Sequence, residues 1–163
     1  MAVSKKLKPA ATGRRKQAAI DSEGTVFMGS IRENVFPPQM PKRLVNGVAV
    51  YAPVVTVVPG KLIFLSGMLA RDNDGNLVGK NDMGAQIHQV GENMKTALAA
   101  AGASLSDLVR TLTFTTDIEE FFRHIDVRMQ YFGASPTSAT IQISRLSHPD
   151  FMVEVEAMAV IPS

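Results

Sequence analysis

The sequence predicts an α+β fold in which a mixed β-sheet is covered on one face by two helices. Strand-like runs stand at both ends of the region 45–163, and two segments between them have the 3.6-residue period of amphipathic helices. Turn residues separate these runs, which gives the order β-β-α-β-α-β-β. Each helical segment has one apolar stripe, so both helices are expected to cover the same face of the sheet.

The first two strands are expected within VAVYAPVVTVVPGKLIFLSG, residues 48–67, on either side of the turn dipeptide Pro59-Gly60. Most of their side chains are β-branched or bulky, which strands favour. Asp74-Gly75 then predicts a tight turn.

The first helix is expected from Asp82, a suitable N-cap, to Ala101, with Gly102 at the left-handed C-cap position. Its apolar stripe consists of Ile87, Val90, Met94, Ala97, Leu98 and Ala101. A strand is predicted over residues 108–115.

The second helix is expected to begin at Asp117, because Asp117 and Glu120 have the spacing of a capping box. Gly133 and Pro136 are expected to end it. Its predicted buried stripe consists of Ile118, Phe122, Ile125, Met129 and Phe132. Two further strands finish the chain.

The last predicted strand carries Glu154 and Glu156 among apolar neighbours. A strand alternates its faces, so both carboxylates point the same way. We expect them, with Thr140 and Gln142, on the sheet face that the helices leave uncovered. A face that is half apolar and half polar favours burial against another subunit. The sequence therefore predicts a homo-oligomer with polar clefts at the subunit junctions.

Length and composition predict one domain with an N-terminal extension. The chain has 163 residues, of which 45% are hydrophobic and 20% charged, which is typical of a globular protein. Residues 1–44 have weak periodicity and include the proline-rich PPQMPKR. We assign 1–44 to a basic N-terminal extension and linker, and 45–163 to the folded domain.

The sequence contains no cysteine, which excludes disulfides, thiolate catalysis and cysteine-ligated zinc. It has no run of about 18 apolar residues that would cross a membrane. Its first residues lack the apolar stretch of a secretory signal. We therefore expect an intracellular, cytoplasmic protein without a membrane partner.

Basic residues are concentrated at the N-terminus. The first 16 residues hold six basic side chains and no acid, whereas the rest of the chain has a formal net charge of −4. Such an arm is either solvated or holds a phosphate-rich partner by counterion release. It has no interleaved aromatic residues on which bases would stack, so nucleic acid is not the expected partner.

The three histidines do not have the spacing of zinc ligands, and there is no glycine-rich phosphate-binding motif. We expect neither a metal nor an organic cofactor. His88 and His124 are predicted to face solvent from the helices. His148 lies in the loop before the last strand, where it is a candidate to border a substrate cleft.

Four segments, in this order and spacing, resemble the Rid family, also called YjgF/YER057c/UK114. They are LIFLSG with the loop DNDGNLVG, LVRTLTFTTDIEEF, PTSATIQISRL and VEVEAMA, all within residues 48–161. The resemblance implies a chorismate-mutase-like α+β fold assembled as a homotrimer with clefts between subunits. It also implies a deaminase activity, the cofactor-free hydrolysis of reactive imines and enamines.

The resemblance implies roles for individual residues. Glu154 corresponds to the family's site glutamate, which positions or activates water. Tyr51 resembles a tyrosine of the family's N-terminal motif, and Ser66 and Gly67 match the Ser-Gly pair of its second strand. Arg145 matches a recurrent arginine of less defined role.

Ser138 is the important departure from the family pattern. The deaminating members have an arginine at this place, two residues after the proline, which grips the substrate carboxylate through a forked guanidinium. A serine hydroxyl offers one neutral hydrogen bond, and losing the ion-pair partner costs about 2–5 kcal/mol of substrate binding. Ordinary 2-imino acid hydrolysis is therefore not expected, and Ser138 with Thr140 is expected to bind a neutral or smaller substrate.

Three functions remain open from the sequence. The first is a hydrolase in which Glu154 activates water for attack on an imine, an enamine or a related conjugated metabolite. The second is a non-catalytic trimer that binds a metabolite, with Glu154 and Glu156 holding arginines or backbone amides at a subunit junction. The third is the endoribonuclease or translation-inhibitor role under which some members of the family are known.

Overall fold

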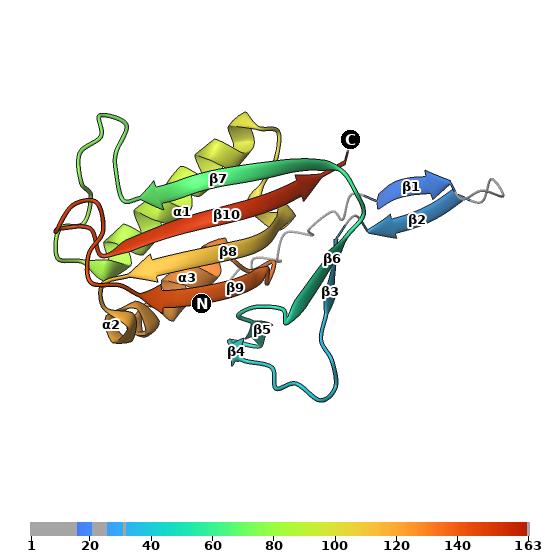
Figure 1. The fold of residues 1–163 in the computed structure, drawn as a ribbon, viewed down its shortest axis with the longest axis horizontal. Coiled ribbons are helices and arrows are strands. Elements are labelled where there is room, and N and C mark those ends of the chain that lie inside the picture. Colours follow the sequence, from blue (N-terminus) through green and yellow to red (C-terminus); the bar gives the residue numbers. More distant parts are fainter. Residues whose placement is uncertain (1–15, 21–25, 31, 163) are drawn as a thin grey trace, which may run out of the picture. The chain divides into compact units, whose positions relative to one another are not determined.

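The computed structural model describes residues 16–20, 26–30 and 32–162 (Figure 1). The chain forms two compact units, Met1–Ser30 and Ile31–Ser163. In the first unit β1 (Lys16–Ile20) pairs antiparallel with β2 (Val26–Ser30), and Lys16 stands opposite Ser30. The predicted basic arm lies, apart from Lys16, outside the described residues.

The second unit is built on a four-stranded sheet with the strand order β7-β10-β8-β9. Its strands are β7 (Lys61–Leu69), β8 (Leu108–Thr115), β9 (Thr137–Gln142) and β10 (Val153–Ile161). β10 pairs antiparallel with both β7 and β8, whereas β8 and β9 are parallel. The sheet is therefore mixed, as the sequence predicts.

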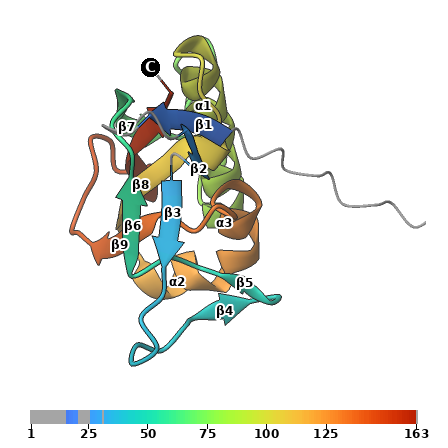
Figure 2. The same cartoon turned by 90° about the vertical axis from the view of Figure 1, so that its right-hand side faces the viewer.

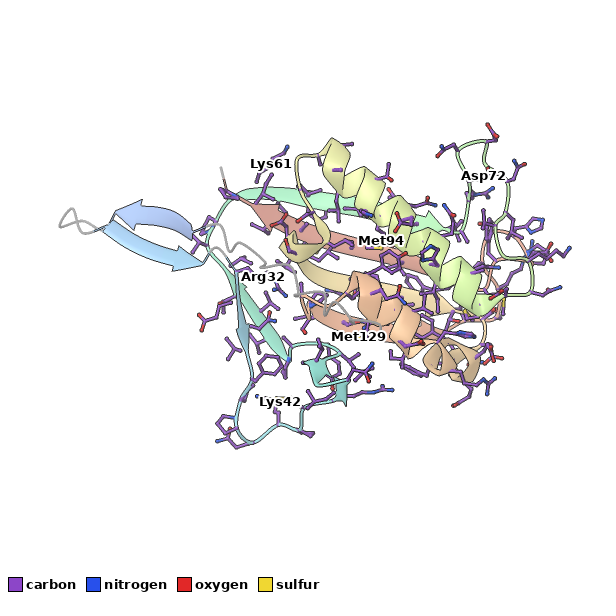
Figure 3. All side chains as sticks on the ribbon, turned by 180° about the vertical axis from the view of Figure 1, so that it is seen from behind. Arg32, Lys42, Lys61, Asp72, Met94 and Met129 are labelled. Carbon is purple, nitrogen blue, oxygen red and sulfur yellow. The ribbon has the colours of Figure 1, made fainter. Side chains whose placement is uncertain are left out.

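Three α-helices cover one face of this sheet (Figures 1 and 2). They are α1 (Met83–Ala100), α2 (Ile118–Arg123) and α3 (Ile125–Tyr131), and a short 3-10 turn, η1 (Leu105–Asp107), precedes β8. The core between helices and sheet includes Ile87, Val90, Met94, Leu98, Phe121, Val153 and Val155. Figure 3 looks from the helix side, with Met94 on α1 and Met129 on α3 in front of the strands. The predicted α+β class is confirmed.

The caps of α1 are those expected from the sequence. The Asp82 carboxylate accepts a hydrogen bond from the Ala85 amide at 2.9 Å, and Gly102 has φ +80° just after the helix. The sequence did not predict the role of Gln86, whose side chain is fully buried on this helix. Its Nε2 donates to the carbonyls of Gly79 and Asp150, and its Oε1 accepts from the Met152 amide.

The second predicted helix is wrong in two respects. It is interrupted at His124, whose φ of −103° and ψ of 28° separate α2 from α3. The interruption rotates the apolar stripe, so that the buried side chains are Phe121, Arg128, Tyr131 and Phe132. Of the five residues of the predicted stripe, only Phe132 is buried. The prediction assumed one continuous helix, and the break at His124 changes which side chains face the core.

Two small antiparallel strand pairs, one enclosed in sequence by the other, precede the sheet within the second unit. β3 (Arg32–Val35) pairs with β6 (Val54–Val57), and β4 (Leu44–Val45) pairs with β5 (Val48–Ala49). Val55 of β6 also packs against Val109 and Val160, which form a second small apolar cluster with Met158. The compact unit thus includes residues 31–44, which the sequence assigned to the linker.

Within the described residues, no helix has the length and apolar character needed to cross a membrane.

Candidate functional site

The Glu154 carboxylate lies against Gly67 on the sheet face opposite the helices. A Cβ atom placed on Gly67 would overlap the Glu154 Oε1 atom, so only a residue without a side chain leaves room for the carboxylate. Val153 and Val155 point from β10 into the helix-covered core, which puts Glu154 and Glu156 on the open face. The structure therefore brings together two of the residues implied by the resemblance.

A β-bulge in β7 creates this contact. Val155 pairs with Met68 and Ala157 pairs with Leu65, so the two residues Ser66 and Gly67 stand opposite the single residue Glu156. A bulge re-aims side chains and bends its strand, and bulges are common beside active sites. Here it places the exposed Ser66 and the partly exposed Gly67 next to the two glutamates.

Neither Glu154 nor Glu156 makes a hydrogen bond or an ion pair with any residue that the structure describes. Partial burial, and secondarily the charge of Glu156, raises the pKa of the Glu154 carboxyl above its usual range. A carboxyl with a raised pKa exchanges protons more readily near neutral pH than an ordinary glutamate does. The alternative that arginines or amides at a subunit junction hold these acids concerns a neighbouring copy of the chain and stays a prediction.

Ser138 and Thr140 lie on the helix-covered face of β9. Thr111 of β8 is opposite Ser138, and its Oγ1 donates to the Ser138 Oγ at 3.0 Å. Thr111 and Thr113 pair with Ala157 and Val155 of the core-facing row of β10. The expectation that Thr140 and Gln142 share the open face with the glutamates is therefore wrong: on β9 the polar row is the one turned toward the helices.

Arg128 of α3 is the functional candidate that sequence reasoning missed. Only 2% of its surface is exposed. Its Nη2 donates to the Ser138 Oγ at 3.1 Å, and its Nη1 donates to the Val50 carbonyl at 3.2 Å. Burial, and secondarily the charge of Arg43, lowers the pKa of Arg128 to about 10. A charged residue is not expected in a core, and this expectation hid Arg128 from the sequence pattern.

Tyr51 follows β5 and is half-buried. The next residue, Ala52, donates its amide to the carbonyl of Pro136 at 3.3 Å, and Pro136 is two residues before Ser138. The segment with Tyr51 therefore runs beside the start of β9, on the Ser138 side of the candidate site. Sequence separation alone gives no sign of this contact.

Arg145 and His148 are both exposed in the loop between β9 and β10. Arg145 forms no ion pair with Glu154 or Glu156 among the described residues. The His148 Nδ1 accepts a hydrogen bond from the Asp150 amide at 3.2 Å, and its ring packs edge-on against Phe151. The structure thus shows that both side chains are exposed in this loop. Their proposed contact with substrate stays a prediction.

A separate polar group lies on the helices. The Tyr131 hydroxyl contacts the Nδ1 atom of His88 and donates to the Glu92 carboxylate at 3.1 Å. Burial, with the hydrogen bond to Glu92, raises the pKa of Tyr131 to about 12. A cavity of about 370 Å³ beside these residues is also lined by Lys95, Leu105 and Gln130. His88 is exposed, as expected, but it has a partner.

The predicted site residues form two groups on opposite faces of one sheet. Glu154, Gly67 and Ser66 form the acidic group on the open face. Ser138 and Thr140 form the second group at β9, where Arg128, which the sequence did not predict, donates to Ser138. Between β10 and β9 lies β8, so one chain does not bring the two groups together. In the part of the chain that the structure describes, no cluster of histidine and acidic side chains has the geometry to hold a metal ion.

Comparison with known proteins gives a consistent result. The sequence model of the family described as Endoribonuclease L-PSP matches residues 40–161. Protein DfrA of Myxococcus xanthus is 38% identical over 130 residues, which is 79% of this chain and 95% of that protein. A RutC family protein of Pyrococcus abyssi is 33% identical, over 78% of this chain and 96% of its own length.

A solved structure shares the fold over nearly its whole length. It is a Yersinia pestis protein of unknown function from the conserved Rid family, with a TM-score of 0.70 and 27% sequence identity. The match covers 80% of this chain and 99% of that protein.

Proposed function

Because the chain belongs to the Rid family, we propose that it hydrolyses an imine, an enamine or a related conjugated metabolite in a cleft between subunits. The observation that supports this most directly is the unpartnered Glu154 carboxylate held against Gly67. A carboxyl group of raised pKa beside a bulged strand suits a reaction whose central need is proton transfer.

Glu154 carries both water protons to the nitrogen in the proposed reaction. As carboxylate it accepts a proton from water while the water oxygen bonds to the imine carbon, and the C=N electron pair moves to nitrogen. Glu154 passes this proton to the nitrogen, which gives a neutral carbinolamine. Glu154 then accepts the carbinolamine hydroxyl proton and delivers it to the amino nitrogen, the C–N bond breaks, and ammonia leaves as the carbonyl forms. These steps balance without a cofactor.

The remaining residues of the site bind the substrate in this proposal. Ser66 and Gly67 provide polar surface beside Glu154, and Tyr51 orients water or substrate through its hydroxyl. Ser138 and Thr140 contact the part of the substrate away from the reacting carbon, while Arg145 and His148 border the cleft. With Ser138 in place of the family arginine, the reaction is not the ordinary 2-imino acid hydrolysis with its forked carboxylate clamp.

The proposal needs more than one copy of the chain. Glu154 and Ser138 occupy opposite faces of the sheet, so a cleft that uses both must lie between subunits. The open face also exposes large apolar side chains, including Leu62, Phe64 and Ile141. We propose a homotrimer, the assembly that the family resemblance implies.

The direct test measures ammonia release from imines that an amino-acid oxidase forms in solution. A range of neutral and acidic amino acids supplies imines of different side chains. The protein should accelerate release above the spontaneous rate, and Glu154→Gln should not. Acceleration that is unchanged in Glu154→Gln would show that the assigned mechanism is wrong.

A non-catalytic role at the same clefts is the alternative within the family. This alternative predicts that no imine is hydrolysed. A metabolite should copurify with the wild type and should be absent from the Gly67→Ala variant. The name of the matching family, Endoribonuclease L-PSP, supports RNA cleavage as a further alternative. That activity should follow the oligomer peak through gel filtration and should not require Glu154.

A further inference from the structure

A second polar site lies on the outer side of the helices, away from the sheet face that carries Glu154. α1 and α3 pack side by side (Figure 3), and a cavity of about 370 Å³ opens beside them. Its lining comes from α1, η1 and α3 and consists of His88, Glu92, Lys95, Leu105, Gln130 and Tyr131. Neither the family resemblance nor the proposed reaction gives these residues a role.

The Tyr131 side chain is fixed by a glycine of the neighbouring helix. A Cβ atom on Gly91 would overlap the Tyr131 ring, so the ring fits against α1 only because Gly91 has no side chain. Glycine is unfavourable inside a helix, and here it is the condition for placing the ring. Only 6% of the Tyr131 surface is exposed. The hydroxyl is therefore held at one defined point between the two helices.

The Tyr131 hydroxyl orders His88 and Glu92, which are four residues apart on α1. It donates its hydrogen to Glu92 Oε1 at 3.1 Å and contacts Nδ1 of His88. A hydroxyl has one hydrogen, so the hydrogen of the second contact comes from Nδ1, which leaves Nε2 of a neutral His88 as an acceptor. The hydrogen bond from Tyr131 lowers the pKa of the Glu92 carboxyl, which is therefore charged at neutral pH. Two acceptors, one of them negatively charged, suit an ammonium group.

Lys95 supplies the opposite charge close to Glu92. Its Nζ lies 3.4 Å from Glu92 Oε2, and the two side chains are 61% and 43% exposed. An ion pair so exposed is weak, so a ligand that takes up both charges displaces little binding energy. The ammonium and carboxylate of an α-amino acid are attached to one carbon atom, and both can therefore pair with Glu92 and Lys95 at once. Leu105 adds an apolar wall.

We infer that the cavity lined by α1, η1 and α3 binds a free α-amino acid with an apolar side chain. The ligand ammonium donates to Glu92 and to His88 Nε2, its carboxylate pairs with Lys95, and its side chain lies against Leu105. Tyr131 is a positioning residue that holds His88 and Glu92. A simple amine or a simple carboxylate leaves one of the two charges without a ligand partner.

The test measures binding of L-leucine by calorimetry on the full-length protein, with two probes that each lack one charged group. Isopentylamine is leucine without its carboxylate, and isocaproate is leucine without its ammonium. Each probe should bind at least about tenfold more weakly than leucine, the lower value of a hydrogen bond to a charged group. No binding of leucine, or equal binding of leucine and either probe, would overturn the inference.

A similar cluster on α2 provides matched controls. Glu120 accepts from Arg123 Nε at 2.7 Å, and its Oε1 lies 3.0 Å from His124 Nε2. Glu92→Gln and Lys95→Gln should each weaken leucine binding about tenfold, whereas Glu120→Gln and Arg123→Gln should leave it unchanged. Equal losses in both pairs of variants would mean that leucine responds to the overall charge of the helices, and the site would be wrong.

Tyr131→Phe separates positioning from a purely structural role. It keeps the ring against Gly91 and removes only the hydroxyl that orders Glu92. Because Glu92 contacts the ligand ammonium, leucine should lose affinity relative to isocaproate. A lower melting temperature with an unchanged ratio of the two affinities would mean that Tyr131 only joins α3 to α1.

Glu154→Gln tests whether this site is separate from the proposed cleft. The variant should bind leucine like the wild type, because Glu154 lies on the opposite face of the sheet. A loss of leucine binding in Glu154→Gln would place the amino acid in the cleft and overturn the second site. Leucine binding that depends on Glu92 and Lys95 supports the second site whether or not imines are hydrolysed.

Discussion

The two faces of the sheet carry unmatched charges of opposite sign. On the open face Glu154 and Glu156 lack a basic partner among the described residues, and partial burial raises the pKa of Glu154. On the helix-covered face no acidic side chain of the described residues pairs with Arg128, and deeper burial lowers its pKa to about 10. In both cases burial disfavours the charged form of the group. The difference shows that one chain holds an unmatched acid and an unmatched base on opposite faces of its sheet and does not bring them together.

The faces also differ in packing. The helix-covered face is closed by a continuous core, whereas the open face leaves Phe64 with 69% of its surface exposed. At one end of the open face Val55 packs on Val109 and Val160. The predictions below test this contrast, in order of decreasing expected effect.

The largest effect is expected from the open-face acid. Glu154→Gln keeps the shape of the side chain but removes the general acid and base, and it should lower imine hydrolysis about 10²- to 10⁴-fold. Ammonia release at saturating substrate measures this. Glu156→Gln is the matched control on the same strand face and should change the rate only a few-fold. An equal loss of hydrolysis rate in Glu154→Gln and Glu156→Gln would mean that the rate depends on the total negative charge of this face and not on the position of Glu154.

A charge placed on the apolar part of the open face should separate the subunits. Phe64→Asp buries a carboxylate in the proposed junction, so the protein should elute at a smaller mass and lose most of its hydrolysis. Gel filtration with light scattering measures the mass. Thr96→Asp, on an exposed position of α1, should leave the mass unchanged. If Phe64→Asp keeps the wild-type mass, this face is not the junction.

Filling the space beneath Glu154 should displace its carboxylate. A methyl group at Gly67 overlaps the carboxylate oxygen, and Gly67→Ala should therefore lower hydrolysis about ten- to hundredfold by misplacing it. Gly133→Ala is the control, since a Cβ there meets only the Met129 carbonyl at an ordinary 3.6 Å. Similar activities of the two variants would remove Glu154 from the mechanism.

The smallest effect is a pH-dependent change of stability. The pKa of Glu154 is raised on folding, so its charge destabilises the folded protein at neutral pH, and this cost disappears below the ordinary carboxyl pKa of about 4.3. Glu154→Gln should raise the melting temperature by a few degrees at pH 7.5, and the gain should vanish near pH 4. A fall in melting temperature at pH 7.5 would instead show that a cation from another subunit stabilises the carboxylate.

The sequence predicted the elements whose signals are local. Asp82 and Gly102 mark the ends of α1, and the strand over residues 108–115 is confirmed, because capping and periodicity act over a few residues. The break at His124 was missed, since both helices on either side have helix-forming sequences. The pairing of β3 with β6 was missed because no local pattern encodes a partner so far along the chain.

The sequence predicted which residues belong to the candidate site, but it did not predict how they are arranged in space. Glu154 and Gly67 both followed from the family resemblance, but their contact depends on a bulge that has no reliable sequence signal. Thr140 was assigned to the wrong face because polarity was taken to mean exposure. On β9 the polar row instead faces buried threonines, with Thr111 donating to Ser138. Arg128 was missed for the same reason, since it is a charged residue that the fold buries.

The side-chain amide of Gln86 fixes the backbone at the point where the loop before β10 ends and the strand begins. It holds the carbonyl of Asp150 and the amide of Met152, so the chain is fixed two residues ahead of Glu154 whatever the preceding residues do. The exposed loop positions 144, 145 and 147–149 are consequently expected to tolerate altered sequences, and a library randomised there would retune the border of the proposed cleft without moving the glutamate. The Met152 amide hydrogen, locked inside the domain, would report the integrity of that anchor by its slow exchange with deuterium.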